Sequence, residues 1–277
     1  MKTRVLVGIP TLNNPPCLAR CLAAIDEATT FDDYDVKLLV ADDCSTSENL
    51  ETNKHLIHRH ERLRNAGKLE MLMSQERSGI AKTWNRLVRH QAADVVVLMN
   101  DDIEVVPDWL DVLVYSVVQN PYAGMVGLNA YVGVTKDRAV PSHRHEYCEA
   151  TLHDGGGELL SSFGPIFAFS REHYDRVQGF DERFFVFYEE LDFGVRLALE
   201  QGLVNYIASY PLVFHAGGAT LSEPKNLDAA AELAWSRELF MSKWGQTLDS
   251  LRARIASIHA TSTMHPREWN TQIKVWR

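Results

Sequence analysis

The chain has 277 residues, of which 45% are hydrophobic and 23% are charged, an ordinary composition for a globular protein that can bury a sizeable core. Its formal net charge of −9 argues weakly against a protein that binds duplex nucleic acid, because phosphate binding usually needs a basic surface. The longest strongly apolar run, residues 95–99, is far shorter than the roughly 20 residues of a membrane-spanning helix, and the N-terminus lacks the apolar core of a signal peptide. We therefore expect a cytoplasmic protein with no integral membrane segment.

Apolar runs alternate with helical patterns in the first half of the chain, which is typical of βαβ units and of a mainly parallel sheet. Strands are predicted over residues 4–9, 36–41, 69–73, 95–99 and 125–128. Helices are predicted to begin at Pro15, to run from Ser45 and Thr46 towards Arg64, to cover residues 78–91 and to begin again at Pro107. The expected fold class is α/β, with a mainly parallel central sheet flanked by helices.

The second half of the chain is less regular. Residues 131–160 hold many glycine, histidine and charged residues, which predicts a loop-rich stretch with room for a hairpin. Strands are predicted over residues 163–169 and 204–213, a helix at the end of residues 181–201, and one or two helices within residues 227–258. The sequence shows no internal repeat and no clear linker, so we expect one domain over residues 1–277.

Three polar clusters follow strands of the predicted sheet, at residues 11–14, 42–45 and 100–102. Ligands of a parallel sheet gather beyond the carboxyl ends of its strands. Asp101 and Asp102 are adjacent carboxylates that repel each other unless a cation or a hydrogen-bond donor relieves the repulsion. Mg²⁺ and Mn²⁺ prefer oxygen ligands, often one or two carboxylates together with substrate phosphates. An isolated Asp-Asp pair could equally form a turn or cap a helix, but three clusters at one sheet edge favour a metal-diphosphate site.

The motifs resemble those of family 2 glycosyltransferases, which have the GT-A fold. GIPTLNN, VADDCST, ERSGIAKTWN and LMNDDIEVVPDW occur in this order, followed by GFDERFFVFYEELDFGVRLALEQG, by FHAGG and by a tryptophan-containing helix. The resemblance spans roughly residues 5–244 and implies a Rossmann-like fold, a nucleotide-diphosphate sugar as donor and a divalent metal, Mn²⁺ or Mg²⁺. It also implies a nucleotide-sugar-binding half, residues 1–128, and an acceptor-binding and catalytic half with C-terminal helices, residues 129–277.

The resemblance assigns donor contacts to residues of the first half. Pro10 and Thr11 would lie against the nucleotide base. Asp42 would accept a hydrogen bond from a uracil-like imide, which favours a UDP- or dTDP-type donor, and Asp43 would lie near the ribose. Arg77 and the start of the helix that follows it would face the donor phosphates, because a cation and a helix N-terminus both favour phosphate.

Asn100-Asp101-Asp102 stands in the place of the family's D-x-D motif. By the resemblance, Asp102 would bind the metal, and Asp101 would approach the ribose or the donor sugar. Asn100 departs from the motif, and its amide is at best a neutral oxygen ligand to the donor or metal. His215 stands at the late position where a histidine completes the metal coordination in many related enzymes, although a structural histidine is an equally good interpretation.

Glu189-Glu190 resembles the family's E-D-x-D-L segment, with Glu190 in the place of the catalytic aspartate. Direct transfer with inversion needs a carboxylate that takes a proton from the acceptor hydroxyl. Both glutamates could instead be first-turn helix residues that the helix dipole favours. We predict that Glu190 is the base, with Glu189 as its competitor. Asp192 and Arg196 are four residues apart, which predicts an ordinary helical ion pair.

The predicted function is therefore metal-assisted, inverting glycosyl transfer from a nucleotide-diphosphate sugar to an acceptor hydroxyl. One alternative is a sugar-1-phosphate nucleotidyltransferase, although such enzymes usually have a Gly-rich basic loop where this chain has Thr-Leu-Asn-Asn-Pro-Pro. Another is a non-catalytic nucleotide-sugar-binding protein, which the departures at Asn100 and Glu190 leave open. The acceptor can be a glycan, a lipid-linked sugar, a protein or a nucleic-acid base, and the sequence leaves the oligomeric state open.

Overall fold

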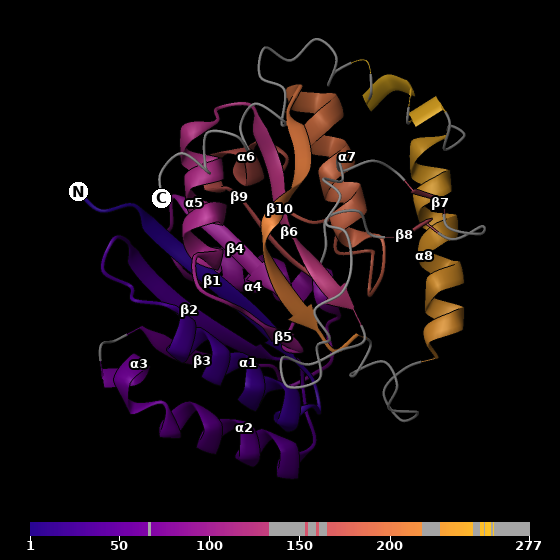
Figure 1. Cartoon of the computed structure of the whole chain (residues 1–277). Helices are drawn as coiled ribbons and strands as arrows, with labels where there is room; N and C mark the ends of the chain where they lie inside the picture. Colours follow the sequence, from indigo (N-terminus) through magenta and orange to yellow (C-terminus); the bar gives the residue numbers. More distant parts are fainter. Residues whose placement is uncertain are drawn as a thin grey trace.

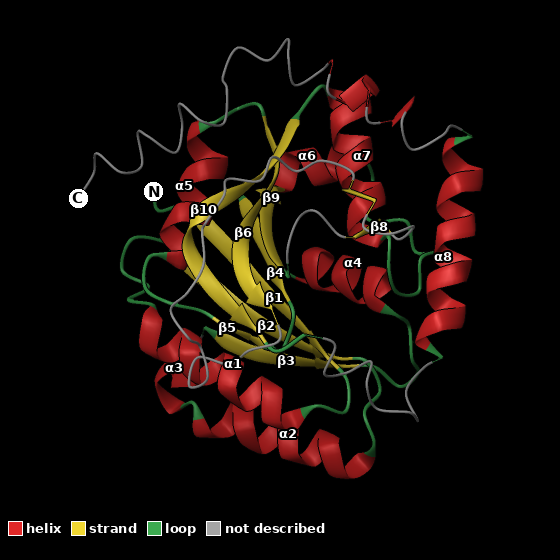
Figure 2. Ribbon diagram, turned by 45° about the vertical axis from the view of Figure 1, so that its right-hand side comes forward, coloured by secondary structure: helices red, strands yellow, loops and turns green. Residues whose placement is uncertain are grey.

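A central eight-stranded sheet with helices on both faces makes up most of the molecule (Figures 1 and 2). The computed structural model describes residues 1–65, 68–132, 153–154, 159–160, 165–217, 228–245, 250–251, 253–255 and 257. The sheet strands are β1 (Arg4–Thr11), β2 (Asp35–Asp42), β3 (Leu69–Met73), β4 (Val95–Met99), β5 (Ile103–Glu104), β6 (Ala123–Val132), β9 (Ile166–Ser170) and β10 (Val204–His215). Their order is β3-β2-β1-β4-β9-β6-β10-β5.

The helices mostly follow the predicted pattern. They are α1 (Pro15–Ala28), α2 (Ser47–Arg59), α3 (Glu61–Asn65), α4 (Ile80–His90), α5 (Trp109–Gln119), α6 (Arg171–Arg176), α7 (Glu189–Gln201) and α8 (Ala229–Trp244). The sequence patterns missed α6 and β5, because six and two residues are too short to show a periodicity. None of the helices in the described part of the chain is both long enough and apolar enough to cross a membrane.

Both faces of the central strands are buried, which explains their uninterrupted apolar sequences. On β4, Val97 enters one core while Val96 and Leu98 enter the other, since successive side chains of a strand point to opposite faces. Trp109 of α5 packs in the first core, and Trp84 of α4 packs in the second. The two layers of helices hold the strand ends in place.

The sheet is mainly parallel, as predicted, with β1 pairing in parallel with both β2 and β4. β3 also runs parallel to β2, and β10 runs parallel to β6. β9 lies between β4 and β6 and is antiparallel to both. It runs in the opposite direction because the chain re-enters the sheet at the carboxyl edge. There the backbone N–H of Asn100 donates to the Pro165 carbonyl at 3.0 Å.

The prediction of one helix from Ser45–Thr46 towards Arg64 is wrong in one respect, because the helix is interrupted at His60. Thr46 caps α2 as expected, and α2 ends at Arg59. His60 and Arg62 both contact Asp26 at the end of α1. The break turns the chain around α1 and places Leu63 in the core, which a straight continuation of a polar helix would not do.

Most of the predicted loop-rich stretch, residues 131–160, lies outside the described residues. The parts that are described include β7 (His153–Asp154) and β8 (Leu159–Leu160), which pair antiparallel as a separate two-stranded sheet. This pairing confirms the expected hairpin.

Candidate active site

The three polar clusters meet at one edge of the sheet, because β2, β1 and β4 are neighbouring parallel strands. Thr11 and Asp42 are register partners at the ends of β1 and β2, and Pro10 stands one position earlier beside Ala41. The Thr11 hydroxyl donates to Asp101 Oδ2 at 2.7 Å. The structure therefore brings the first and third clusters into direct contact.

Asp42 is buried, with 1% of its surface exposed, and its carboxylate is held from two sides. Oδ1 accepts a hydrogen bond from the Ser45 amide at 2.8 Å, and Oδ2 accepts one from Asn53 Nδ2 at 3.0 Å. A carboxylate accepts about four hydrogen bonds, so it keeps capacity for a ligand in a fixed orientation. The sequence patterns missed Asn53, because a polar residue on a polar helix shows no sign of burial.

Asp43 turns away from Asp42 and binds the turn before α4. Its Oδ1 accepts hydrogen bonds from the Ser78 amide at 2.9 Å and the Ser78 hydroxyl at 2.6 Å, and its Oδ2 accepts one from the Gly79 amide at 3.0 Å. The next amide, that of Ile80, donates to the Phe185 carbonyl at 2.7 Å. Three consecutive amides, those of Ser78, Gly79 and Ile80, are therefore bound within the protein, and the phosphate contact of this helix start stays a prediction.

Arg77 and Gly79 lie against Phe185. The Arg77 guanidinium carbon is 5.5 Å from the centre of the Phe185 ring. Gly79 has a φ of +78°, and a Cβ added there would lie 2.4 Å from the Phe185 carbonyl oxygen. Glycine is required at this position, because other residues neither adopt this φ readily nor leave room for the approach. The phosphate contact of Arg77 stays a prediction.

Asp102 and His215 lie side by side, as the metal-site prediction requires. The short β5 pairs antiparallel with the end of β10, with His215 opposite Ile103. The Ala216 amide donates to the Asp102 carbonyl at 3.1 Å. His215 Nε2 is 3.2 Å from Asp102 Oδ1, and these two atoms do not form a well-aligned hydrogen bond.

Asp102 Oδ1 is buried without a hydrogen bond in the described part of the chain, which is costly for a carboxylate oxygen unless a ligand binds it. An unsatisfied carboxylate oxygen beside an imidazole nitrogen fits one divalent cation. The described residues hold no group of three or more His, Cys, Asp or Glu side chains suited to a metal. Asp102 and His215 could hold an ion together with oxygens of a donor diphosphate.

β5 is held from α1 by a contact that the sequence patterns missed. Arg20 Nε is 3.3 Å from the buried Glu104 carboxylate, and Arg20 Nη2 donates to Cys17 Sγ at 3.0 Å. Since β5 pairs with the strand end that carries His215, this ion pair also supports the Asp102–His215 geometry.

The pKa of the Asp101 carboxyl group is raised above its usual value. Its burial raises the pKa to about 8, while the hydrogen bond from Thr11 acts to lower the pKa and the charge of Asp102 adds to the rise. Asp101 therefore carries a proton near neutral pH unless a cation or a hydrogen-bond donor joins it. The backbone N–H of Asn100 donates a hydrogen bond to the Pro165 carbonyl. This bond fixes the backbone at the end of β4.

Glu189 and Glu190 open α7, as predicted, and both are buried. One carboxylate oxygen of each, Oε2, has no hydrogen-bond partner among the described residues. Burial, and then the neighbouring Glu190 charge, raises the pKa of Glu189 well above its usual range. Phe187 and Tyr188 precede the pair with φ of 66° and 68°, a left-handed conformation that costs free energy in non-glycine residues.

The pair is joined to the strand-end cluster through Phe185. Phe185 contacts the 77–79 turn, and Asp43 at the end of β2 binds the same turn. The described contacts thus connect Asp43, at the carboxyl edge of the sheet, with Phe185, which stands four residues before Glu189.

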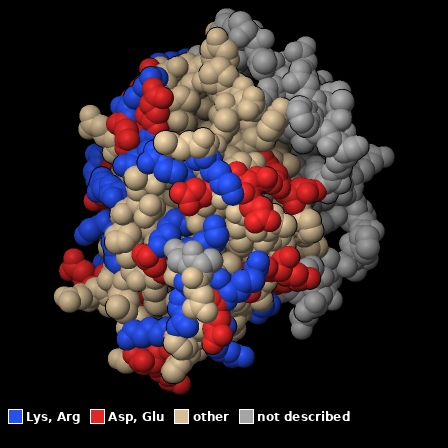
Figure 3. All heavy atoms as spheres, turned by 90° about the vertical axis from the view of Figure 1, so that its left-hand side faces the viewer, with Lys and Arg blue, Asp and Glu red and all other residues tan. Residues whose placement is uncertain are grey.

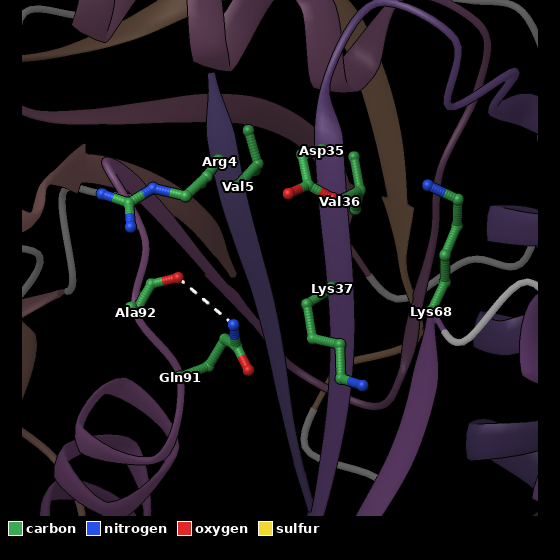
Figure 4. Close-up of a pocket in the computed structure, with 8 residues that line it drawn as sticks. All are labelled: Arg4, Val5, Asp35, Val36, Lys37, Lys68, Gln91 and Ala92. Atoms are coloured by element: carbon green, nitrogen blue, oxygen red, sulfur yellow. Dashed lines mark hydrogen bonds between the residues drawn. The ribbon is translucent and has the colours of Figure 1, made fainter. Parts of the chain in front are cut away.

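A hollow of about 170 Å³ lies at the opposite edge of the sheet, where β1 and β2 begin (Figure 4). Its lining residues are Arg4, Val5, Asp35, Val36, Lys37, Lys68, Gln91 and Ala92. Asp94 pairs with Arg4, and Glu70 pairs with Lys37. In Figure 3, Lys and Arg lie beside Asp and Glu over much of one face of the molecule. The hollow therefore lies away from the carboxyl ends of the strands, where ligands of a parallel sheet gather.

The order of the strands and the helices on both faces of the sheet define the class of fold, the GT-A fold. The sequence profile of Glycosyl transferase family 2 matches residues 6–178, more than half of the chain. The chain therefore belongs to this family, as the order of its motifs predicted. It has no significant match among curated proteins.

Solved glycosyltransferases share the fold at low sequence identity. Residues 1–349 of S. aureus TarS are 15% identical with a TM-score of 0.60, over 95% of this chain and 73% of that chain. Mannosyltransferase PcManGT from Pyrobaculum calidifontis, solved with GDP-Man and Mn²⁺, is 17% identical with a TM-score of 0.60, over 99% and 81%. GalNAc-T7, solved with UDP, GalNAc and Mn²⁺, is 15% identical with a TM-score of 0.60, over 77% and 44%. The match to a longer TarS chain spans 36% of its length.

Proposed function

We propose that the chain is an inverting, metal-assisted glycosyltransferase that moves a sugar from a UDP- or dTDP-type donor to an acceptor hydroxyl. The observation that carries the proposal is the Asp102–His215 pair, with its unsatisfied buried oxygen, at the carboxyl edge of the sheet. A metal-free binding protein has no need for such a costly arrangement.

Asp102 and His215 would hold Mn²⁺ or Mg²⁺. When bound, the ion supplies positive charge to the departing diphosphate. PcManGT and GalNAc-T7 were both solved with Mn²⁺, which supports the metal. Their nucleotides are GDP-Man and UDP respectively, so the preference for a uracil- or thymine-type base rests on the oriented carboxylate of Asp42.

Glu190 would act as the base. Its carboxylate takes the proton of the acceptor hydroxyl while the hydroxyl oxygen attacks the anomeric carbon from the face opposite the leaving group. The bond to the diphosphate breaks as the new bond forms, and the nucleoside diphosphate leaves with the bonding electrons. Glu190 stands in the place of the family's catalytic aspartate, which supports this choice.

Other features follow from the same proposal. The acceptor is a hydroxyl of a glycan, a lipid-linked sugar, a protein or a small molecule bound beside Glu190, and a modified nucleic-acid base is also compatible. The cytoplasmic location, the single domain and its division into donor and acceptor halves stay predictions.

The test is turnover with a donor panel. The protein is incubated with Mn²⁺ and UDP-glucose, UDP-GlcNAc, dTDP-glucose or GDP-mannose, and the release of nucleoside diphosphate is measured with and without EDTA. We expect release from a uridine or thymidine donor that EDTA stops. Asp102→Asn should abolish the response to Mn²⁺, whereas Asp175→Asn, which changes an exposed helical pair, should keep it. Binding of the donors without any release would contradict the enzymatic role.

The same incubation separates the nucleotidyltransferase alternative. A nucleotidyltransferase releases pyrophosphate from a nucleoside triphosphate and a sugar-1-phosphate, and it leaves the nucleotide sugar intact. Pyrophosphate formation from UTP and glucose-1-phosphate would replace the proposed function by this one.

A further inference from the structure

One ammonium group binds both ends of the segment that carries the glutamate pair. Lys243 Nζ, from α8, is 2.7 Å from Asp181 Oδ2 and 2.7 Å from Asp192 Oδ1. Glu189 and Glu190 lie between these two aspartates in the sequence. We call residues 181–192 the base segment.

The Asp192 end of this contact is buried, so the loss of a partner there would leave a carboxylate poorly compensated away from water. The side chain of Asp192 is 0% exposed and that of Lys243 is 20% exposed. Trp244 Nε1, next to Lys243, donates to the same Asp192 oxygen at 3.2 Å. Arg196 binds the other oxygen of Asp192 at 2.8 Å, so the helical pair predicted from the sequence is part of a larger buried cluster.

α8 makes two further contacts with the base segment. The Ser236 hydroxyl donates to the Val186 carbonyl at 2.7 Å, and the Phe240 ring lies 5.4 Å from the Tyr188 ring. α8 stands at the rim of the molecule, beyond α7 and away from the sheet (Figures 1 and 2). Among the described residues, each side-chain hydrogen bond that α8 makes outside itself ends on residues 181–192. The side-chain hydrogen bonds of α8 therefore end on the base segment, while its Phe240 packs in the second core.

The base segment needs external support. Phe187 and Tyr188 hold two successive left-handed conformations directly before the glutamates. Such strain persists only where surrounding contacts over-determine the backbone. α4 holds one side through the Ile80–Phe185 hydrogen bond, and α8 holds the other side.

We propose that Lys243 is a positioning residue for glycosyl transfer. By binding Asp181 and Asp192 together, it fixes the base segment so that the Glu190 carboxylate meets the acceptor hydroxyl. This inference rests on the proposed function, with Glu190 as the base. Lys243 itself acts through the two aspartates and the backbone between them.

The test compares Lys243→Met, which removes the charge at similar length, with Lys243→Arg, which keeps a cation. Arg196 still compensates Asp192 in both variants, so we expect both to fold, as circular dichroism will check. Lys243→Met should lower kcat by about 10²-fold with the donor KM unchanged, because a small displacement of a catalytic group costs about this much. Lys243→Arg should recover most of the loss. Lys54→Met, which breaks an exposed pair with Glu51, is the matched control.

Hydrogen–deuterium exchange supplies a readout that does not depend on activity. Lys243→Met should raise the exchange of peptides from residues 181–192 above the control variant, with peptides from β1 and β4 unchanged. Unchanged exchange in residues 181–192 would overturn the inference even if the wild-type protein transfers sugar. Wild-type kcat in Lys243→Met, or a fall in kcat matched by a rise in the donor KM, would also overturn it. If the wild-type protein transfers nothing, the proposed function fails and exchange alone decides whether Lys243 ties the segment.

Discussion

The carboxyl edge of the sheet, where we propose that the nucleotide binds, and the base segment are built in different ways. At the edge, Thr11, Asp42 and Asp102 stand at or just after the ends of neighbouring parallel strands, so the sheet register places them. The base segment belongs to no strand, and contacts from α4 and α8 hold it. The edge therefore depends on local sequence and backbone pairing, whereas the base segment depends on side chains far away in the chain.

This difference predicts which changes separate donor binding from transfer. Changes at the edge should affect the affinity for the nucleotide. Changes in the contacts of the base segment should affect turnover and leave the affinity intact. Three substitutions, from the largest expected effect to the smallest, test this separation, and a fourth tests the acid sensitivity of the base segment.

Glu190→Gln should lower kcat by about 10²- to 10⁴-fold, because an amide cannot take the acceptor proton. The affinity for UDP with Mn²⁺, measured by isothermal titration calorimetry, should be unchanged. Glu200→Gln on the exposed side of the same helix should behave like the wild type. Full turnover by Glu190→Gln would move the base role away from Glu190 and make Glu189 the next candidate.

Gly79→Ala should lower kcat by about 10²-fold, because the added Cβ pushes on the Phe185 carbonyl and displaces the base segment. The matched control is Gly202→Ala, since Gly202 also has a positive φ, +68°, but has no atom within 4 Å of an added Cβ. Both variants should lose about 1–2 kcal/mol of unfolding free energy from backbone strain, measured in urea. Equal kcat in the two variants would show that the Gly79–Phe185 contact does not position the glutamates.

Asn53→Leu should weaken UDP binding by about tenfold, the equivalent of about 1.4 kcal/mol, because Asp42 loses the group that orients it. The kcat at saturating donor should be unchanged, since the base segment is untouched. Thr52→Val, which removes a hydroxyl contact on the exposed side of the same helix, is the control. A lower kcat with an unchanged UDP affinity would contradict the separation of the two regions.

Asp181 should give the base segment an acid-sensitive contact. Its burial alone would raise its pKa, but hydrogen bonds from Arg183 and Lys243 outweigh the burial and hold the pKa below its usual value. A carboxylate whose pKa is lower in the folded state stabilises the fold above the unfolded pKa of about 3.9, and this stabilisation is lost as the pH falls towards the folded pKa. The free energy of unfolding should therefore fall below pH 4, measured by urea unfolding at a series of pH values.

Asp181→Asn should reduce the slope of this fall. Asp175→Asn, in an exposed pair with Arg171, should leave the slope as in the wild type. An identical slope in Asp181→Asn would show that the acid sensitivity arises elsewhere.

Much of the fold was predictable because apolar periodicity is local. β3 and β4 have the predicted bounds, and the strand ends carry the predicted polar clusters. The pairing of His215 with Asp102 was predictable only through the resemblance to family 2 glycosyltransferases. β5, which brings the two residues together, is two residues long and leaves no sequence pattern.

The sequence by itself determined the α/β class, the family and the residues that follow the strands, because strand periodicity and motif order are written in consecutive residues. Only the tertiary structure decided how those residues are used: Asp43 binds the turn before α4, Asn53 orients Asp42, and Lys243 ties residues 181–192. These contacts join side chains 11 to 62 positions apart, and the burial that makes them strong exists only after the helices pack on the sheet.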